Sequence, residues 1–318
     1  MGHVEKLCGV LREVYGYPSL RRGQLEASVA IMQGQDVVVR MTTGSGKSLC
    51  YQLPVLALEK CCLVISPLNS LMNDQVETLK QLQVPAAAIP LRSRSLTAGQ
   101  AAQYITSNKF IFMSPETALS KVWLECFSKS QCNNLIGLIA VDEAHCICDW
   151  GNNFRPQFKE LRKLRSFLQC PVMAMTATAP SKMLREISQS LCMTRKVLVS
   201  YPLDRPNIFL YAKKTPQSQK AILSLLFGLT SLESFPKTIV YVQRKVKAVK
   251  LWQCLSSRGL QVGLHHSSLR ADTRRQVEMQ FKTGKILVVI ATIGFGMGID
   301  IPDVHMVVNL GLPSTIEE

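Results

Sequence analysis

The chain has 318 residues, which is longer than one ordinary domain and enough to bury two hydrophobic cores. Its 37 Lys and Arg residues outnumber 22 Asp and Glu residues, and the net charge of +15 favours a polyanionic partner, nucleic acid before membrane, although a solvated basic surface is the simpler alternative. No apolar run approaches about 18 residues and no signal-peptide core is present, which argues against a membrane-spanning or secreted protein.

Helices and strands alternate through the first two hundred residues. Apolar residues at helical spacing predict a helix over residues 4–15, which Gly16 and Pro18 end, and a second helix over Arg22–Gln33. Short continuous apolar runs predict buried strands at Val37–Arg40, Cys62–Ser66, Phe110–Met113, Leu135–Val141 and Val172–Met175. Amphipathic segments between them predict helices at Ser48–Leu58, Leu68–Leu82 and Lys182–Leu191. This alternation implies a mostly parallel sheet covered on both faces.

The pattern pauses at residues 201–214, where Y-P-L-D-R-P-N supplies two prolines and little helical periodicity. A domain linker is predicted there. Beyond it, two further strands and two further helices are predicted at Ile239–Val242, Ile286–Ala291, Lys245–Arg258 and Ala271–Lys282. The sequence therefore predicts an α/β protein of two lobes, residues 1–207 and a smaller lobe at 208–318.

The segment M-T-T-G-S-G-K-S, Met41–Ser48, predicts a phosphate-binding loop. It lies between a predicted strand and a predicted helix, Gly44 and Gly46 let the backbone wrap closely, and the dipole of the following helix faces the phosphates. In this role Lys47 reaches the β- and γ-phosphates and Ser48 holds Mg²⁺. The strict pattern has glycine where this chain has Met41, and a glycine turn that merely precedes a helix is the alternative.

The segment D-E-A-H, residues 142–145, follows the apolar strand that ends at Val141. Ligands of an open parallel sheet bind at the carboxyl ends of its strands. Asp142 is expected to anchor Mg²⁺ and Glu143 to accept a proton from the attacking water, a division that suits phosphoryl transfer. His145 would sense the γ-phosphate. A solvated acidic loop is the alternative, which the upstream Lys47 weakens.

Trp150, Phe154 and Arg155 place two aromatic rings beside a cation, directly after these acids. Nucleic-acid bases stack on such rings at about 1–3 kcal/mol each. The alternative is that Trp150 and Phe154 are core residues. Their position in a Gly- and Asn-containing loop favours contact with a nucleic acid.

These motifs resemble the RecQ family of superfamily 2 DNA helicases over nearly the whole chain. The other matching segments are L-R-R-G-Q at Leu20–Gln24, S-P-L-N-S-L-M-N-D-Q-V at Ser66–Val76, S-P-E at Ser114–Glu116, M-T-A-T-A at Met175–Ala179, D-R-P-N at Asp204–Asn207 and A-T-I-G-F-G-M-G-I-D at Ala291–Asp300. The resemblance implies two RecA-like lobes, ATP and Mg²⁺ as cofactors, single-stranded DNA and duplex junctions as partners, and a nuclear location.

The resemblance also implies a role for individual residues. Those expected to read the base of ATP are Tyr17, Arg21 and Gln24. Those expected to bind the rest of the nucleotide are Thr43, Gly44, Ser45, Gly46, Lys47, Ser48, Gly298 and Asp300. Those expected to contact DNA are Ser66, Pro67, Asn73, Gln75, Trp150, Phe154, Arg155, His266 and Thr292. The expected catalytic set is Lys47, Asp142, Glu143 and His145, with Mg²⁺ held through ATP by Ser48 and Asp142.

No zinc site is expected. The eleven cysteines form no regular C-x-x-C pattern and are interpreted as reduced thiols of a cytosolic or nuclear protein. Cys146 and Cys148 lack a matching pair, and His265 and His266 lack further ligands at metal-binding spacing.

Two departures from the family pattern bear on activity. Asn152 and Asn153 stand where the family has histidine and aspartate, so neither position can carry charge, and this allows the coupling of DNA binding to hydrolysis to differ. The chain also stops at Glu318, just before the family's arginine-rich motif. Because an arginine at the transferring phosphate is worth about 10³–10⁵ in rate, crippled hydrolysis is expected if 318 is the true end.

The sequence is thus interpreted as an ATP-dependent DNA helicase that moves 3′ to 5′ along single-stranded DNA in repair or recombination. A truncated paralogue or fragment that binds ATP and DNA without efficient turnover is the first alternative, and an RNA-directed DEAH-type helicase is the second. No membrane association is expected, and the sequence does not indicate protein partners.

Overall fold

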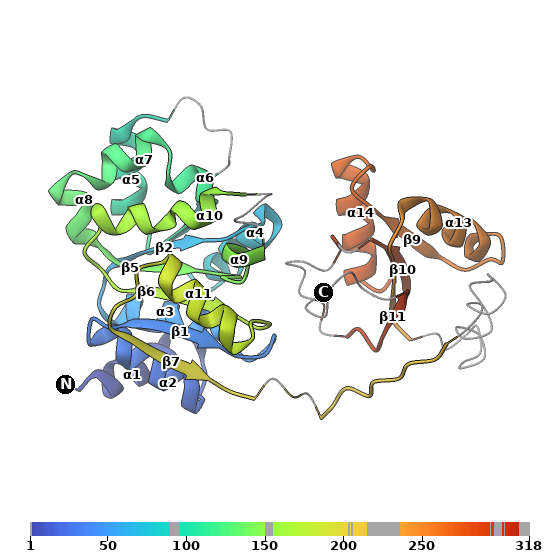
Figure 1. Cartoon of the computed structure of the whole chain (residues 1–318), viewed down its shortest axis with the longest axis horizontal. Coiled ribbons are helices and arrows are strands. Elements are labelled where there is room, and N and C mark those ends of the chain that lie inside the picture. The colour runs from blue at the N-terminus through green and yellow to red at the C-terminus, as the bar shows by residue number, and fades with distance from the viewer. Residues whose placement is uncertain are drawn as a thin grey trace. The chain divides into compact units, whose positions relative to one another are not determined.

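The structure, a computed structural model of the chain, describes residues 2–89, 96–149, 155–202, 204, 206–214, 236–292, 294–295, 301 and 303–311. Contacts divide the chain into two compact units, residues 1–206 and 207–318 (Figure 1). Among the described residues, no helix is both long enough and apolar enough to cross a bilayer.

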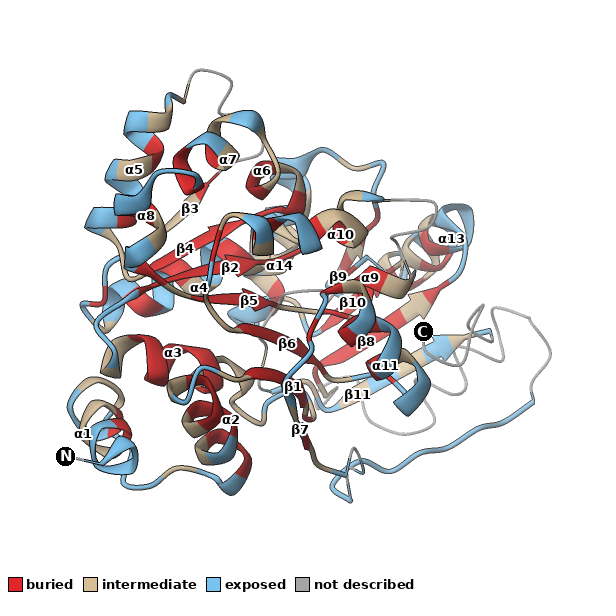
Figure 2. Cartoon of the chain, turned by 60° about the vertical axis from the view of Figure 1, so that its left-hand side comes forward, coloured by how far each residue is buried: buried red, intermediate tan, exposed pale blue. Residues whose placement is uncertain are grey.

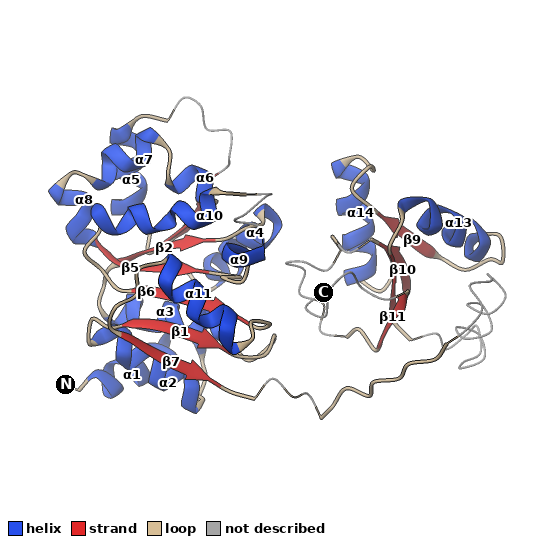
Figure 3. Ribbon diagram, viewed as in Figure 1, coloured by secondary structure: helices blue, strands red, loops and turns tan. Residues whose placement is uncertain are grey.

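Unit 1 is built on a seven-stranded sheet in the order β3-β4-β2-β5-β6-β1-β7, in which every described pairing is parallel. Figure 3 shows β2, β5, β6, β1 and β7 of this sheet in that order. Its strands are β1 Asp36–Arg40, β2 Cys61–Ile65, β3 Ala86–Ile89, β4 Phe110–Met113, β5 Ile136–Val141, β6 Val172–Thr176 and β7 Lys196–Ser200. In the register of the sheet, Val38 of β1 lies opposite Ala174 of β6 and Leu198 of β7.

Both faces of this sheet are buried. Successive side chains of a strand point to opposite faces, so Val37 and Val39 of β1 join one core cluster and Val38 joins the other. In β2, Cys62 and Leu63 divide in the same way. Burial on both faces explains why the sequence has continuous apolar runs rather than alternation, and Figure 2 shows the buried strands between helices with exposed outer surfaces.

Helices cover each face. The face of Val37 carries α2 Arg22–Met32, α3 Lys47–Ala57 and α4 Asn69–Gln81, and α1 His3–Tyr15 packs on this layer through Leu7 and Leu11. Helix α1 ends where predicted, because Gly16 adopts a left-handed φ of 68° and its N–H bonds back to Arg12. The opposite face carries α5 Ala98–Ser107, α6 Pro115–Ala118, α7 Lys121–Phe127, α8 Ser130–Leu135, α9 Cys146–Asp149, α10 Gln157–Glu160, the 3₁₀ helix η1 Leu161–Ser166 and α11 Ser181–Ser190.

Unit 2 contains a four-stranded parallel sheet in the order β11-β8-β10-β9. Its described elements are β8 Thr238–Val242, α13 Lys245–Ser256, β9 Val262–His265, α14 Ala271–Lys282, β10 Val288–Ala291 and β11 Met306–Leu310. Leu251 and Leu255 of α13 pack on one face, and Phe281 of α14 packs on the other. The predicted fold class, two RecA-like α/β lobes with parallel sheets between helices, is confirmed.

The cysteines allow a direct test of the unit 1 core. Burial raises the pKa of the Cys50 and Cys61 thiols to about 12, whereas Cys192 is exposed. Since the thiolate is the reactive form, a maleimide at pH 7.5 is expected to modify Cys192 in the native protein and to reach Cys50 and Cys61 only after denaturation. Mass spectrometry of peptides checks this, with Cys192→Ser as the control. Rapid native labelling of Cys61 would contradict the assigned core.

Candidate nucleotide-binding site

The candidate site is formed by three neighbouring strands of unit 1. Strands β5, β6 and β1 are adjacent in the sheet and parallel, so their carboxyl ends meet at one edge. The segment after β1, residues 41–48, is a loop that leads into α3 at Lys47, the segment after β5 is D-E-A-H, and the end of β6 leads into T-A-T at residues 176–178. The fold thus brings together three segments that lie far apart in sequence, at the edge where parallel sheets bind ligands.

The loop after β1 depends on two glycines. Gly44 and Gly46 have φ values of 77° and 79°, in the left-handed region that favours glycine. A Cβ on Gly46 would lie 2.5 Å from the side-chain nitrogen of Gln24. Met41 lies outside the left-handed region and its side chain is buried in the core, which explains why methionine is accepted where the strict pattern has glycine.

Side-chain donors hold this loop in its curved form. The Lys47 ammonium donates to the carbonyl oxygens of Met41 and Thr42, both at 3.2 Å. Arg21 Nη1 donates to the carbonyl oxygen of Ser45 at 2.9 Å, and Gln24 Nε2 donates to those of Ser45 and Gly46 at 3.2 Å. The loop is therefore tied to the start of α2 as well as to itself.

The residues predicted to read the base lie beside this loop. Gln24 is buried and its Oε1 accepts from the backbone N–H of Arg21, which caps α2. Tyr17 is 53% exposed. The contacts of Arg21 and Gln24 are with the loop itself, and base recognition by the three residues stays a prediction. Thr43 and Gly44 are exposed at the tip of the loop, and Ser48 lies in the first turn of α3.

Asp142 and Glu143 follow β5 and oppose this loop. Burial, and then the neighbouring Glu143, raise the pKa of Asp142 to about 6, against the lowering effects of Lys47 and His145. Burial also raises the pKa of Glu143, and burial lowers the pKa of Lys47 although both acids oppose that shift. Glu143 has a φ of 47°, a left-handed conformation that costs a residue with a side chain on the order of 1–3 kcal/mol. Such strain and mutual charge perturbation are typical of functional sites.

His145 connects the acids to the next strand. Its Nδ1 lies 3.3 Å from Glu143 Oε2 and 3.3 Å from Thr176 Oγ1. Thr176 is fully buried at the end of β6, and its hydroxyl also accepts from the N–H of Thr178. Both segments were identified from the sequence, but the contact between His145 and Thr176 was not. That contact could have been expected, because each residue follows or ends one of two predicted buried strands.

The site fits Mg²⁺ and a nucleoside triphosphate. The Ser45 hydroxyl is buried and has no hydrogen-bond partner among the described residues, which suits a polar ligand seated in the loop. Asp142 and Ser48 would supply oxygen ligands of the kind that Mg²⁺ prefers. In the described part of the chain, no cluster of three or more acidic, His or Cys side chains could hold a metal.

The residues predicted to contact DNA differ in how far they are exposed to solvent. In unit 1, Asn73 is exposed, Gln75 is half-buried, and Ser66 is 1% exposed with a hydroxyl that has no described partner. Pro67 is buried and Arg155 makes an internal ion pair. In unit 2, His266 is buried and Thr292 is half-buried, with its N–H bonded to His265. The predictions for Trp150, Phe154, Asn152, Asn153, Gly298 and Asp300 lie outside the described residues.

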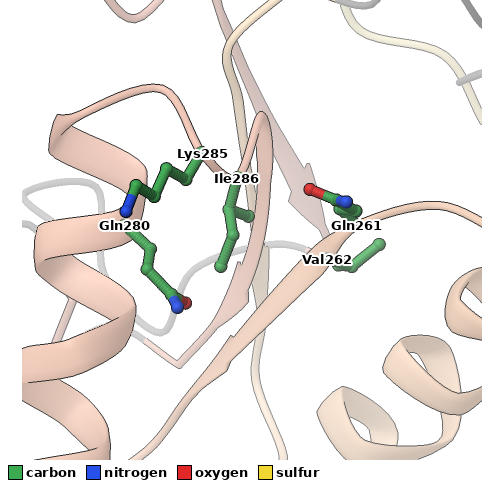
Figure 4. Close-up of a pocket in the computed structure, with 5 residues that line it drawn as sticks. All are labelled: Gln261, Val262, Gln280, Lys285 and Ile286. Carbon is green, nitrogen blue, oxygen red and sulfur yellow. The ribbon is translucent and has the colours of Figure 1, made fainter.

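A shallow pocket of about 540 Å³ lies in unit 2, lined by Gln261, Val262, Gln280, Lys285 and Ile286 (Figure 4). It adjoins the amino ends of β9 and β10, whereas His266 and Thr292 follow the carboxyl ends of the same parallel strands. Within unit 2, the pocket therefore lies at the opposite ends of these strands from His266 and Thr292.

The fold places this chain among proteins with two RecA-like lobes, with the glycine-containing segment 41–48 at the carboxyl edge of the unit 1 sheet. The solved structure of Saccharomyces cerevisiae Dbp5 bound to RNA and ADP BeF3 superposes with a TM-score of 0.76 at 20% identity, covering 99% of this chain and 80% of that one. A likeness at this identity shows the fold.

Sequence comparison gives the family. The DEAD/DEAH box helicase profile matches residues 21–187, and the helicase conserved C-terminal domain profile matches residues 217–318. The chain belongs to the DEAD/DEAH box helicases, and its RecQ resemblance is confirmed. It is 35% identical to the ATP-dependent DNA helicase RecQ of Haemophilus influenzae over 97% of this chain and 49% of that protein. It is 32% identical to the ATP-dependent helicase wrn-1 of Caenorhabditis elegans over 98% of this chain and 30% of that protein. It therefore spans half or less of these relatives' length.

The raised pKa of Asp142 predicts a stability gain when its charge is removed. The folded-state pKa of about 6 exceeds the ordinary 3.8, so the stability that the neutral group contributes is complete below about pH 4 and is lost as the pH rises through 6. In metal-free buffer at pH 7, Asp142→Asn is expected to raise the unfolding free energy, because it removes an unfavourable charge. The expected gain is only about 1–2 kcal/mol, because the side chain is partly exposed and solvent screens the charge. Near pH 4 it should match the wild type.

Urea unfolding with EDTA at both pH values measures this. Asp36→Asn is the control, because Asp36 is a buried acid whose carboxylate is paired with Arg165 and accepts from the N–H of Val172. That substitution should destabilise the protein at pH 7. A destabilised Asp142→Asn at pH 7 would contradict the assigned environment of Asp142.

Proposed function

We propose that the chain is an ATP-dependent DNA helicase of the RecQ type that couples ATP hydrolysis to movement along single-stranded DNA and to duplex unwinding. The observation that carries the proposal is the meeting of Lys47, on the loop after β1, with Asp142 and Glu143 after β5, at the edge of one parallel sheet. DNA is proposed as the track because relatives such as the Haemophilus influenzae protein are named DNA helicases.

Each residue has a proposed task in hydrolysis. Lys47 and the N-terminus of α3 bind the phosphates, and Ser48 and Asp142 hold Mg²⁺, which when bound neutralises charge on the phosphates. Glu143 accepts the proton of the attacking water, a task that a raised pKa favours near neutral pH. His145, which contacts both Glu143 and Thr176, passes the state of the acids to the T-A-T segment.

The proposed direction of movement, biological role and division into lobes rest on the family resemblance. We propose 3′ to 5′ movement, a role in repair or recombination, and an ATP-binding lobe at residues 1–207 with a C-terminal helicase lobe at 208–318. The division of contacts after Pro206 supports this boundary. A nuclear location is proposed on the same resemblance, although relatives that match the chain include bacterial proteins.

Two other functions lead to different outcomes. An RNA-directed helicase has some support in the fold shared with RNA-bound Dbp5, but the W-G-N-N-F-R loop and M-T-A-T-A resemble RecQ proteins. A chain that binds ATP and DNA without efficient turnover is the non-catalytic alternative.

ATPase assays of the protein test the proposal. Single-stranded DNA is expected to stimulate phosphate release, whereas RNA of equal length is expected to have little effect. Lys47→Ala should lower the stimulated rate about a hundredfold or more, because it removes a donor to charge that develops in the transition state. Glu143→Gln should lower the rate by a similar factor while nucleotide binding persists.

The outcomes separate the three functions. Stimulation by RNA alone would support the RNA-directed enzyme. Binding of ATP and DNA without stimulation would support the non-catalytic chain. Equal rates for wild type and Lys47→Ala would contradict the assigned site.

A further inference from the structure

Two cysteine side chains outside the candidate nucleotide site are in contact with each other. Cys126 lies near the end of α7 and Cys132 lies in α8, and their Sγ atoms are 3.5 Å apart. Both residues are buried, at 0% and 4% exposure. The sulfurs of a disulfide are about 2.0 Å apart, so a modest approach of these two side chains is enough for a bond to form.

The backbone between the two cysteines holds them in this relation. The N–H of Lys129 donates to the carbonyl oxygen of Cys126 at 3.2 Å, and the N–H of Cys132 donates to the carbonyl oxygen of Lys129 at 3.0 Å. Two successive hydrogen-bonded turns therefore connect one cysteine to the other. Both side chains enter the same core cluster, beside Trp123 and Phe127.

The two helices are short enough to open locally. Helix α7 has seven residues and α8 has six (Figure 1), and isolated helices shorter than about 12–15 residues are marginally stable in water. The segment between them, residues 128–131, is exposed. Because local opening of such elements costs less free energy than global unfolding, a small reagent can reach thiols that are buried in the closed form.

In the closed form the thiols are unreactive. Burial, and then the hydrogen bond and charge of Cys132, raise the pKa of the Cys126 thiol to about 12. The thiolate is the nucleophile in thiol–disulfide exchange. The reaction of this pair is therefore expected to be limited by opening and to be slower than that of the exposed Cys192.

We propose that Cys126 and Cys132 form a modification site, at which a low-molecular-weight disulfide converts the two thiols into an intrachain disulfide that fastens α7 to α8. The thiolate of one cysteine attacks a sulfur of glutathione disulfide, and one glutathione leaves as its thiolate. The other cysteine then loses its proton and displaces the second glutathione. Two protein thiols are oxidised, and one glutathione disulfide is reduced to two glutathione thiols, which take up the two protons.

This site lies away from the candidate nucleotide site. Helix α8 leads into the amino end of β5, whereas Asp142 and Glu143 follow its carboxyl end. The disulfide is therefore independent of the proposed function, and neither nucleotide nor DNA enters its test. Its main expected effect is on stability, because a crosslink restricts the unfolded chain.

Peptide mapping of the folded protein tests the proposal. The protein is incubated near neutral pH with mixtures of glutathione and glutathione disulfide, its free thiols are blocked, and it is digested with trypsin without reduction. Trypsin cleaves after Lys129, between the two cysteines, so the two resulting peptides stay joined only through a disulfide. We expect joined peptides when glutathione disulfide is in excess, and we expect dithiothreitol to separate them.

Thermal unfolding measures the effect of the crosslink. The oxidised protein should unfold about 5 °C above the reduced protein. The comparison is made in Cys192→Ser, so that glutathione attached to that exposed thiol does not contribute. Cys192→Ser should keep both the joined peptides and the gain in unfolding temperature, whereas Cys126→Ser and Cys132→Ser should each lose both.

The peptide map of the wild type decides even where a serine variant does not fold. Wild-type protein in which glutathione modifies Cys192 but no peptides become joined would overturn the proposal. Joined peptides that form only in urea would also overturn it, because the pair would then react only in the unfolded chain. An oxidised protein that unfolds at the same temperature as the reduced one would contradict the fastening of α7 to α8.

Discussion

The candidate site depends on three charges that are held close together where none is well solvated. Burial acts against the charged form of Lys47, Asp142 and Glu143 alike, and the attraction between the lysine and the acids offsets part of this effect at all three. The left-handed backbone of Glu143 adds strain at the same place. Buried charges and backbone strain raise the free energy of the ligand-free protein. Binding of a polyphosphate together with its cation would offset that cost.

The strand order places two groups of interacting side chains at one edge of the unit 1 sheet. The strands β4, β2, β5, β6 and β1 are consecutive neighbours. The loops after the last three carry the candidate nucleotide site, and the segments after the first three are joined by the contacts of Arg155 with Glu116 and Pro67, so β5 belongs to both groups. Rigid parallel strands, packed on both faces, keep these loops at fixed spacing while the loops themselves carry the chemistry.

The sequence predicts the buried strands best. Fully buried runs such as Phe110–Met113 coincide with β4, and Val37–Arg40 differs from β1 by one residue, because burial on both faces requires continuous apolar residues. The strands that were missed are β3, β7, β9 and β11, and their sequence signals are weaker. Strand β7, K-V-L-V-S, is a half-exposed edge, and β3 is largely alanine. At the site, motifs identified Lys47, Asp142 and Glu143, but a motif cannot reveal that Arg155 faces Glu116 across 39 positions, because that contact depends on strand order.

We propose that Lys47 and the two acids form one binding site for a nucleotide and Mg²⁺. Calorimetric titration of the 318-residue chain with a non-hydrolysable ATP analogue tests it most directly, with Mg²⁺ or with EDTA. We expect binding that weakens at least about tenfold in EDTA and again in Lys47→Ala, since each change removes positive charge from the phosphates. Equal affinity for wild type and Lys47→Ala, with no dependence on Mg²⁺, would contradict the account.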